Sequence, residues 1–382
     1  MTARIRPAAP AEPGEHFEAV VAGGGPAGAV AALVLARGGR RVLLVDGPTG
    51  GSGLSTLKVG ETLPPAARPL LHDLGLWSAF TAEAHLRCAG TYASWGSEKL
   101  HGRSHLYDPH GHGWHLDRIR FDAFLRDAAE KAGARLLRAH VVRHLTDAGE
   151  PRVVIREQGL LKEVRCDWVV DATGRRAVIG RQRAVRRRQD RLVAAFALFS
   201  HRVPGHHTED SELRTLVEAV PQGWWYTARV PDGRLVAHLT DVDLAETGLR
   251  TAEGFLGSVA RTRHIRVRLD GYDPAHVPAP RWTAAHGLRL STPTGPGWVA
   301  AGDAAIAFDP LSSQGILTAL HTGARAGQTV DLCLAGETGA VAAYAAFLDH
   351  IADAYRRHHA ESYHQEQRWQ KHAFWQRRQR SP

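Results

Sequence analysis

The fold of this 382-residue chain is decided by the stretch FEAVVAGGGPAGAVAALVLARGGRRVLLVD, which runs from Phe17 to Asp46. It reads as a short apolar strand, a glycine turn, an alanine-rich helix and a second apolar strand that ends on an acid. Gly23, Gly25 and Gly28 hold the positions of a GxGxxG turn. The missing side chains allow a tight turn, a close approach of backbone to a pyrophosphate, and packing of the helix on the strand. The segment predicts a dinucleotide site, with Asp46 accepting from ribose hydroxyls; a purely structural glycine turn is the alternative.

Three later segments favour FAD as the dinucleotide. An amphipathic helix lies between Trp114 and Leu137, and a buried-type strand in WVVDATGRRAVIGR, residues 168–181, runs into a turn where glycine allows close packing beside a cofactor. The segment GWVAAGDAAIAFDPLSSQGILTAL, residues 297–320, reads as a strand, a Gly-Asp pair and a loop that opens a long helix. Candidate cofactor residues in these segments include Asp171, Gly174 and Gly302.

The order of GGGPAG, the Arg118 helix, DATG and GDAA…DPLSSQGI resembles the FAD-dependent monooxygenase superfamily with the hydroxybenzoate-hydroxylase type of fold, over nearly the whole chain. LKVGETLPP at 57–65, DPLSSQG at 309–315 and RWQKHAFWQRR at 368–378 resemble its tryptophan-halogenase-like branch. Within that branch the resemblance is greatest to flavoprotein monooxygenases that modify tryptophan in tryptophylquinone protein precursors.

The resemblance assigns roles to several of these residues. It implies that Asp303 binds a ribityl hydroxyl, that Pro310 lies beside the reactive face of the flavin, and that Arg118 lies near the phosphate and ribityl region. We expect Gln314 and Gly315 to offer backbone N–H groups to the flavin, because a helix N-terminus stabilises the negative charge that reduction brings. A solvated cation at a helix start is the alternative for Arg118.

The expected fold is α/β, with a Rossmann-like FAD-binding domain, an inserted mixed β-sheet substrate domain and a C-terminal helical cap. An arginine-rich loop at 181–191 and a turn-rich segment at 273–282 mark the ends of the middle region. The predicted divisions are a flexible tail at 1–16, FAD-binding segments at 17–84, 115–182 and 285–335, substrate-domain segments at 85–114 and 183–284, and C-terminal helices at 336–382.

The resemblance implies an enzyme that hydroxylates an electron-rich aromatic ring through a flavin C4a-hydroperoxide formed from O2. An indole is the favoured ring, either free or as tryptophan in a peptide or protein, in a maturation or natural-product pathway. Between Asp171 and Pro296 there is no second GxGxxG for NAD(P)H. Electrons therefore come from NAD(P)H docking transiently near the flavin, or through a flavin reductase.

Three alternatives remain open: a flavin-dependent halogenase, a double-bond reductase, and a non-catalytic FAD-binding partner protein. Halogenases of the branch carry a catalytic lysine that the corresponding stretch 87–96 lacks; the nearest lysine is Lys99. Ser313 and Gln314 depart from the DPLSGEG loop of the reductases.

The candidate catalytic residues are Glu61, Lys58 and His115. Glu61 is the expected general base, provided that burial raises its pKa. Lys58 would neutralise Glu61 or donate to the peroxide, and pairing of the two at a turn is the alternative. His115 would hydrogen-bond the substrate or shuttle a proton. Trp224 and Tyr226 lie in a strand-like run and would bind an indole by stacking; a place in the core is the alternative.

Composition excludes other classes of protein. The net charge of +9 comes from 48 basic against 39 acidic residues, but the cations are scattered, so we expect no nucleic acid partner. The histidines between His101 and His115 have no carboxylate or cysteine at a convincing spacing, so no metal is expected. Three cysteines without a CxxC pair favour a reducing cytoplasm, and no apolar run reaches the roughly 18 residues of a membrane span.

The C-terminal segment from Ala340 is helical in character, basic and interleaved with aromatic residues. We expect its aromatic stripe to pack over the substrate domain, with Arg377 and Arg378 in solvent. Docking of an acidic peptide leader or partner protein is the alternative.

Overall fold

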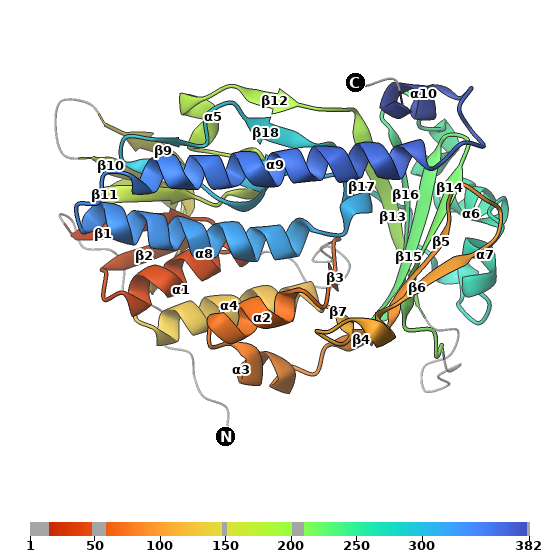
Figure 1. Cartoon of the computed structure of the whole chain (residues 1–382), viewed down its shortest axis with the longest axis horizontal. Helices are drawn as coiled ribbons and strands as arrows, with labels where there is room; N and C mark the ends of the chain where they lie inside the picture. The colour runs from red at the N-terminus through yellow and green to blue at the C-terminus, as the bar shows by residue number, and fades with distance from the viewer. Residues whose placement is uncertain (1–14, 48–58, 147–150, 201–209, 380–382) are drawn as a thin grey trace.

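The computed structural model describes residues 15–47, 59–146, 151–200 and 210–379. Figure 1 shows a layered α/β part that contains β1 and α8, a second part built on a large sheet, and the long helix α9 that runs along both. The expected α/β class with a helical C-terminal part is confirmed.

The first sheet has a parallel centre, with strands in the order β19-β20-β11-β1-β2-β8. Its central strands are apolar and buried on both faces, as parallel strands between two covering layers are. Ala22, Val45, Asp171 and Ala300 lie level at the carboxyl ends of four neighbouring parallel strands. The strands of this sheet are β1 (His16–Ala22), β2 (Val42–Asp46), β8 (Arg135–Arg138), β9 (His140–Leu145), β10 (Arg152–Glu157), β11 (Leu160–Asp171), β19 (Thr294–Gly295) and β20 (Trp298–Ala300).

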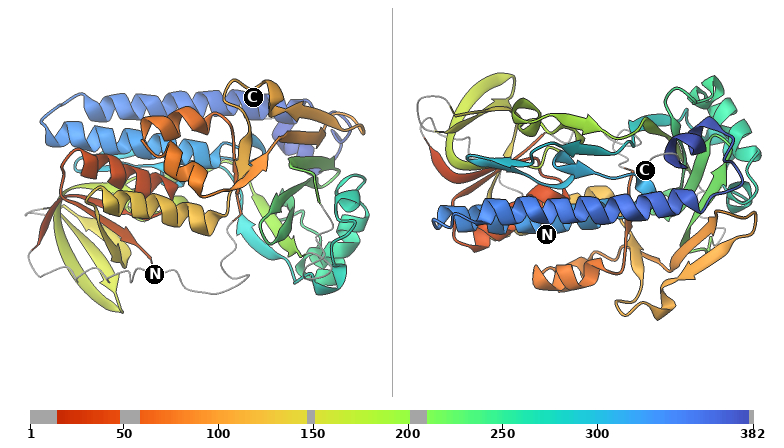
Figure 2. Two further views of the ribbon diagram at one scale, coloured as in Figure 1. Left: turned by 90° about the horizontal axis from the view of Figure 1, so that it is seen from below. Right: turned by 45° about the horizontal axis from the view of Figure 1, so that its top comes forward.

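Helix α1 (Pro26–Arg37) crosses from β1 to β2 and packs between α4 (Arg118–Lys131) and α8 (Gly315–Leu334). Small residues permit the α1–α8 contact: a Cβ on Gly323 would lie 2.2 Å from the Ala27 carbonyl oxygen. The two views of Figure 2 show α8 and α9 (Ala340–His364) side by side on this layer. The shorter helices are α2 (Ala67–Asp73), α3 (Trp77–Ala82) and α5 (Gly180–Arg183).

The second sheet has seven strands in the order β17-β13-β16-β15-β14-β5-β6, and only β14 and β5 pair in parallel. One apolar face packs against aromatic residues near the C-terminus, and the other is covered by α6 (Ala252–Ala260) and α7 (Ile265–Arg268). Both faces are therefore buried, which explains the nearly continuous apolar runs. Its strands are β5 (Gly90–Ser94), β6 (His101–Ser104), β13 (Leu192–Phe199), β14 (Arg214–Val220), β15 (Gly223–Val230), β16 (Gly233–Asp241) and β17 (Arg281–Ala284).

Two three-stranded sheets join the main parts, in the orders β3-β7-β4 and β12-β18-β21. The first brings the segment around Glu61 and Thr62 against His115. The strands of these sheets are β3 (Thr62–Leu63), β4 (Leu86–Cys88), β7 (Gly113–His115), β12 (Arg186–Arg188), β18 (Leu288–Leu290) and β21 (Ile306–Ala307).

The C-terminal aromatic residues pack as expected: Tyr363 of α9, with Phe374 and Trp375 of α10 (Ala373–Gln379), is buried against the seven-stranded sheet. The expectation that Arg377 and Arg378 are solvated is wrong for Arg378, whose side chain is 4% exposed. It ion-pairs with Asp241 at 2.7 Å, because burying its aliphatic stem against the aromatic residues requires a partner for the charge.

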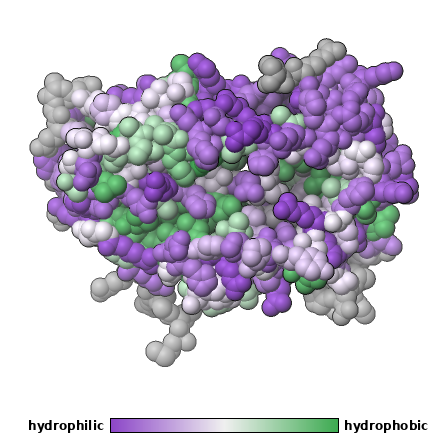
Figure 3. Space-filling model, in the orientation of Figure 1, coloured by the Kyte–Doolittle hydropathy of each residue, from purple (hydrophilic) through white to green (hydrophobic). Residues whose placement is uncertain are grey.

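Among the described helices, none is both long and apolar enough to cross a membrane. Figure 3 shows a mostly hydrophilic face on the side of the seven-stranded sheet, with apolar patches over the helical layer.

Candidate functional site

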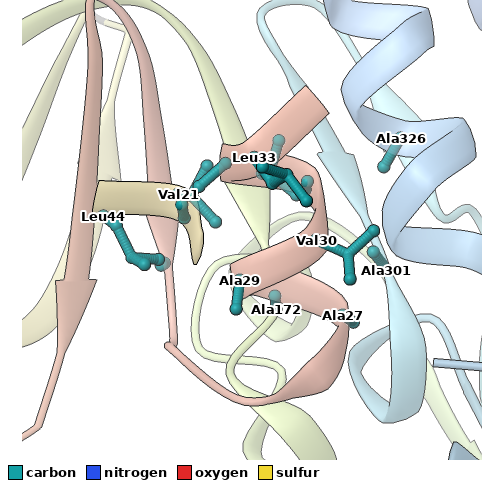
Figure 4. Packing of buried hydrophobic residues seen from close by; sticks show 14 of the residues in the cluster. Val21, Ala27, Ala29, Val30, Leu33, Leu44, Ala172, Ala301 and Ala326 are labelled. Atoms are coloured by element: carbon teal, nitrogen blue, oxygen red, sulfur yellow. The ribbon is translucent and has the colours of Figure 1, made fainter. Parts of the chain in front are cut away.

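The glycine turn leaves β1 at the carboxyl edge of the parallel sheet. Gly23 has φ +101°, and a Cβ there would lie 2.3 Å from the Ala172 carbonyl oxygen. A Cβ on Gly28 would lie 1.8 Å from the Gly23 carbonyl oxygen, whereas one on Gly25 would meet no atom within 4 Å. The outer two glycines are required by packing, and the middle one leaves the helix N-terminus open to a ligand. Figure 4 shows the buried side chains around this turn, among them Ala27, Ala172 and Ala301.

Asp46 ends β2 beside the glycine turn. Its Oδ1 accepts from the Gly24 N–H at 2.9 Å, and its Oδ2 lies 3.1 Å from Arg138 and 3.5 Å from Arg126. Arg126, from α4, also donates to the Gly24 carbonyl oxygen at 3.1 Å. A carboxylate has about four acceptor positions, so ribose hydroxyls can be accommodated as well.

The DATG turn follows β11, and Asp171 holds it together. The buried carboxylate accepts from the Thr173 N–H and hydroxyl at 3.0 and 2.6 Å, and from the N–H groups of Ile179 and Gly180 at 2.8 and 2.7 Å. Asp171 therefore shapes the turn with its own side chain. Gly174, at φ +63° with no atom within 4 Å of an added Cβ, is the position that stays open.

The Gly302-Asp303 pair follows β20 and lies against the start of α1. Gly302 has φ +57°, and a Cβ there would lie 2.8 Å from the Ala27 Cβ. The half-buried Asp303 carboxylate lies 3.6 Å from Arg175. Withdrawal from bulk water raises the pKa of Asp303, while Arg175 and Arg118 oppose the rise. The carboxylate is thus positioned to accept from a bound hydroxyl group.

The loop after Asp309 leads to α8. Asp309 is fully buried, and its Oδ1 accepts from the Leu311 N–H at 2.9 Å. Pro310, Gln314 and Gly315 are exposed, and an added Cβ on Gly315 would meet no atom within 4 Å. The open N-terminus of a 20-residue helix therefore presents free N–H donors here.

Glu61 and Tyr226 join the two parts of the molecule. Glu61 is 2% exposed, and its Oε1 accepts a short hydrogen bond from the Tyr226 hydroxyl, while its Oε2 accepts from the Gly60 N–H at 3.0 Å. The Thr62 hydroxyl lies 3.0 Å from the Tyr226 oxygen. Burial raises the pKa of Glu61, and the Tyr226 hydrogen bond opposes that rise. A buried carboxyl whose pKa is raised in this way is suited to accepting and returning a proton.

Arg118 starts α4 beside this pair. It donates to the Gly60 carbonyl oxygen at 2.8 Å and pairs with Asp122 at 3.2 Å, and its side chain is 14% exposed. It also favours the ionised forms of Glu61 and Asp303. These contacts show that Arg118 is not a solvated helix-start cation, and they hold it beside Glu61.

A model of the FAD binding domain matches residues 16–342. The chain belongs to this FAD-binding family. It is 28% identical over 372 residues to the FAD-dependent oxidoreductase LodB of Marinomonas mediterranea, covering 95% of this chain and 97% of LodB. It is 25% identical over 339 residues to a tryptophan 2-halogenase of Chondromyces crocatus, covering 83% of this chain and 62% of that protein. Among solved structures it is similar to the peptidyl tryptophan dihydroxylase QhpG, with a TM-score of 0.77, 25% identity, and coverage of 96% and 79%. These relatives support an enzyme of the tryptophan-halogenase-like branch.

The described residues fit FAD. Two open helix N-termini, at Gly25 and Gly315, suit its negatively charged groups, and Asp46 and Asp303 are acceptors for its sugar and ribityl hydroxyls. All of these groups lie at or beyond the carboxyl edge of the parallel sheet, where open α/β sheets bind ligands.

The other predicted residues are Lys58, His115 and Trp224. Lys58 lies outside the described residues. His115 is fully buried, its Nε2 lies 3.2 Å from the Leu213 carbonyl oxygen, and burial lowers its pKa to about 4, which favours the neutral imidazole. Trp224 is 1% exposed and donates to the Tyr363 hydroxyl at 3.1 Å, so it is a core residue and no face remains for stacking on an indole.

The sequence interpretation missed Arg126, Arg175 and Asp122. A signal existed for Arg175, since it directly follows the DATG turn. No local pattern distinguishes Arg126 or Asp122 from other charged residues of an amphipathic helix. Among the residues that the structure describes, no group of three or more histidine, cysteine or acidic side chains is arranged to hold a metal ion.

Proposed function

We propose that the protein is an FAD-dependent monooxygenase that hydroxylates an electron-rich aromatic ring. The favoured substrate is an indole, free or as a tryptophan of a peptide or protein, in a maturation or natural-product pathway. The observation that carries the proposal is the buried Glu61 carboxyl, held by Tyr226 of the seven-stranded sheet. Similarity to QhpG over 96% of the chain supports the choice of tryptophan.

When bound and reduced, FAD would react with O2 and supply the oxygen atom that is transferred to the ring. Glu61 then has a defined role, because hydroxylation replaces a ring hydrogen by oxygen and the displaced proton needs an acceptor. Tyr226 fixes the Glu61 carboxyl, and in this proposal its partly buried ring also contacts the substrate. Val59, Tyr226 and Leu311 pack on the same apolar cluster, so Glu61 lies on the side of the sheet that faces residues 309–315, which we call the cofactor loop. The apolar residues of this cluster shield Glu61, which is 2% exposed, from bulk water.

Halogenation is the second candidate, because the tryptophan 2-halogenase is as similar in sequence as QhpG. The stretch that corresponds to the lysine segment of halogenases, Arg87–Gly96, has no lysine. Lys99 lies exposed in the connection that leads to the edge strand β6. Both observations favour hydroxylation.

We infer that electrons reach FAD from NAD(P)H, either directly or through a separate flavin reductase. The described part of the chain has a single dinucleotide-type turn, and the match to the FAD binding domain supports FAD as its ligand. Hence NAD(P)H has no Rossmann-type binding unit of its own among these residues.

The test is a product analysis. Purified protein is incubated with FAD, a flavin reductase, NADH and O2 in the presence of chloride or bromide, with tryptophan in one set and tryptophan-containing peptides in another. A mass gain of one or two oxygen atoms on tryptophan is expected, with the Glu61→Gln variant as the matched control. A halogen mass shift would instead establish the second candidate, and flavin turnover with no change in any indole would contradict both.

A further inference from the structure

Helix α9 presents three side chains, each one turn apart, to the start of the cofactor loop. Tyr355 stacks on Phe308 with ring centroids 4.2 Å apart, and its hydroxyl accepts from the Asp309 N–H at 2.9 Å. His359 lies four residues on, with Nε2 3.3 Å from Asp309 Oδ2. Tyr363 lies four further on, and its hydroxyl donates to the same oxygen at 2.7 Å. Residues at this spacing share one face of a helix, so the three act on Asp309 together.

The Asp309 carboxylate is the centre of this cluster. It is fully buried, and its other oxygen accepts from the Leu311 N–H within the loop. Burial alone would favour the protonated acid, but the hydrogen bond and charge of His359, the charge of Arg378 and the Leu311 N–H outweigh it and lower the pKa of Asp309. An ionised, fully bonded carboxylate therefore ties the first turn of the loop to α9.

The same cluster reaches the substrate sheet. Trp224 donates to the Tyr363 hydroxyl at 3.1 Å. Trp224 and Tyr226 lie two residues apart on β15 and therefore point to the same face of the sheet, where Tyr226 holds Glu61. A continuous set of hydrogen bonds thus runs from the strand that carries Tyr226 through Tyr363 and Asp309 into the loop.

The loop itself has a conformation that needs support. Ser313 has φ +51°, a left-handed backbone that residues other than glycine adopt only when the surroundings hold them there. The exposed Gln314 and Gly315 follow directly and open α8. The direction of the backbone N–H groups of Gln314 and Gly315 therefore depends on how firmly the loop is fixed at Asp309.

We propose that Asp309 and Tyr363 are positioning residues for the flavin: they fix the 309–315 loop against α9, and through Trp224 they couple its position to the substrate sheet. The inference rests on the placement of the flavin beside this loop. It does not depend on which ring is oxidised. The negative charge of Asp309 lies next to the cofactor loop, so it also opposes reduction of a flavin bound there.

The test compares two tyrosines of the same helix. Tyr363→Phe removes the hydroxyl bonded to Asp309 and Trp224 but keeps the ring. Tyr344→Phe is the matched control: Tyr344 is also buried on α9, yet its hydroxyl donates to the Ala300 carbonyl oxygen at 2.8 Å. The readouts are the FAD dissociation constant, the absorption spectrum and midpoint potential of bound FAD, and the thermal unfolding temperature, none of which needs a substrate.

For Tyr363→Phe we expect a weakening of FAD binding by about 10-fold and a shifted flavin spectrum, while Tyr344→Phe lowers only the unfolding temperature. A second variant, Asp309→Asn, keeps the size of the side chain and is expected to make the midpoint potential more positive, because a negative charge is removed. Equal FAD affinity, spectrum and potential in wild type, Tyr363→Phe and Asp309→Asn would overturn the inference. Wild-type protein that binds FAD but never oxidises an indole would contradict the proposed function and leave this comparison valid.

Discussion

Tyr226 donates a short hydrogen bond to Glu61 across the boundary between the seven-stranded sheet and the FAD-binding part. The acid belongs to the segment that precedes β3, and the phenol belongs to β15, 165 residues later. Burial raises the pKa of the acid, and the phenol restrains the rise. Glu61 is therefore a group at the boundary between the two parts that can take up a proton.

Replacing Glu61 by Gln removes the proton acceptor and keeps the shape of the side chain. We expect the rate of indole hydroxylation to fall by about 100-fold or more, the usual contribution of a positioned acid or base. FAD affinity should be unchanged, since no cofactor contact is assigned to this carboxyl. Stopped-flow measurement of product formation, with FAD titration as the control, tests this. A variant that keeps its full rate would show that Glu61 is only a structural partner of Tyr226.

The pH dependence follows from the same pair. Because burial raises the pKa of Glu61, the acid holds its proton to a higher pH than an ordinary glutamate, and a base that must be ionised loses activity as pH falls through that raised pKa. The acid limb of the rate profile should therefore lie above the ordinary glutamate value of about 4.3. Tyr226→Phe removes the hydrogen bond that favours the ionised form, so the limb should move to still higher pH. A limb that stays in place or moves to lower pH would contradict this assignment.

Gly25→Ala and Gly28→Ala separate cofactor binding from folding. A Cβ on Gly25 meets no atom within 4 Å, and its φ of −75° suits alanine, so the free energy of unfolding should change by about 1 kcal/mol or less. The methyl group would nevertheless occupy the space where the pyrophosphate approaches, so FAD affinity should fall at least about 10-fold.

Gly28→Ala should act differently, because its Cβ would lie 1.8 Å from a backbone oxygen that cannot move without opening the turn. Loss of the folded protein is the expected outcome, measured by circular dichroism and soluble yield. If Gly25→Ala bound FAD as tightly as wild type, the proposal that the pyrophosphate of FAD lies against this turn would be wrong.

The parts of the site that the sequence predicts are those with local causes. Gly23, Gly25 and Gly28 lie within six residues, and the structure gives a steric reason for Gly23 and Gly28, whereas the space beside Gly25 is open. Gly174 and Gly302 likewise have positive φ values at the turns where the sequence pattern requires glycine.

The contacts that the sequence could not predict join distant segments. Asp309 meets His359 and Tyr363 from 50 and 54 residues away, and nothing in the loop indicates which helix will cover it. Trp224 and Tyr226 show the same limit: they share one face of β15, but Tyr363 covers the first, whereas the hydroxyl of the second reaches Glu61. Alternation along a strand predicts the face, and only packing decides what each side chain meets.

Substitutions of Asp171 and Asp303 distinguish an acid that stabilises the fold from an acid that binds the cofactor. Asp171 accepts from four donors within its own turn, so Asp171→Ala leaves buried N–H groups without partners and should reduce the free energy of unfolding by about 3 kcal/mol. Asp303 is half-buried and lies 3.6 Å from Arg175, so Asp303→Ala should cost about 1 kcal/mol or less.

For FAD affinity the expected order is reversed. A charge-assisted hydrogen bond to a ribityl hydroxyl contributes about 1.5–3 kcal/mol, so Asp303→Ala should weaken FAD binding by roughly 10- to 100-fold at nearly unchanged stability. Urea unfolding of the FAD-free proteins and FAD titration measure the two quantities separately. An Asp303→Ala protein that binds FAD normally would remove this carboxylate from the cofactor site, because its ion pair with Arg175 would then be its whole function.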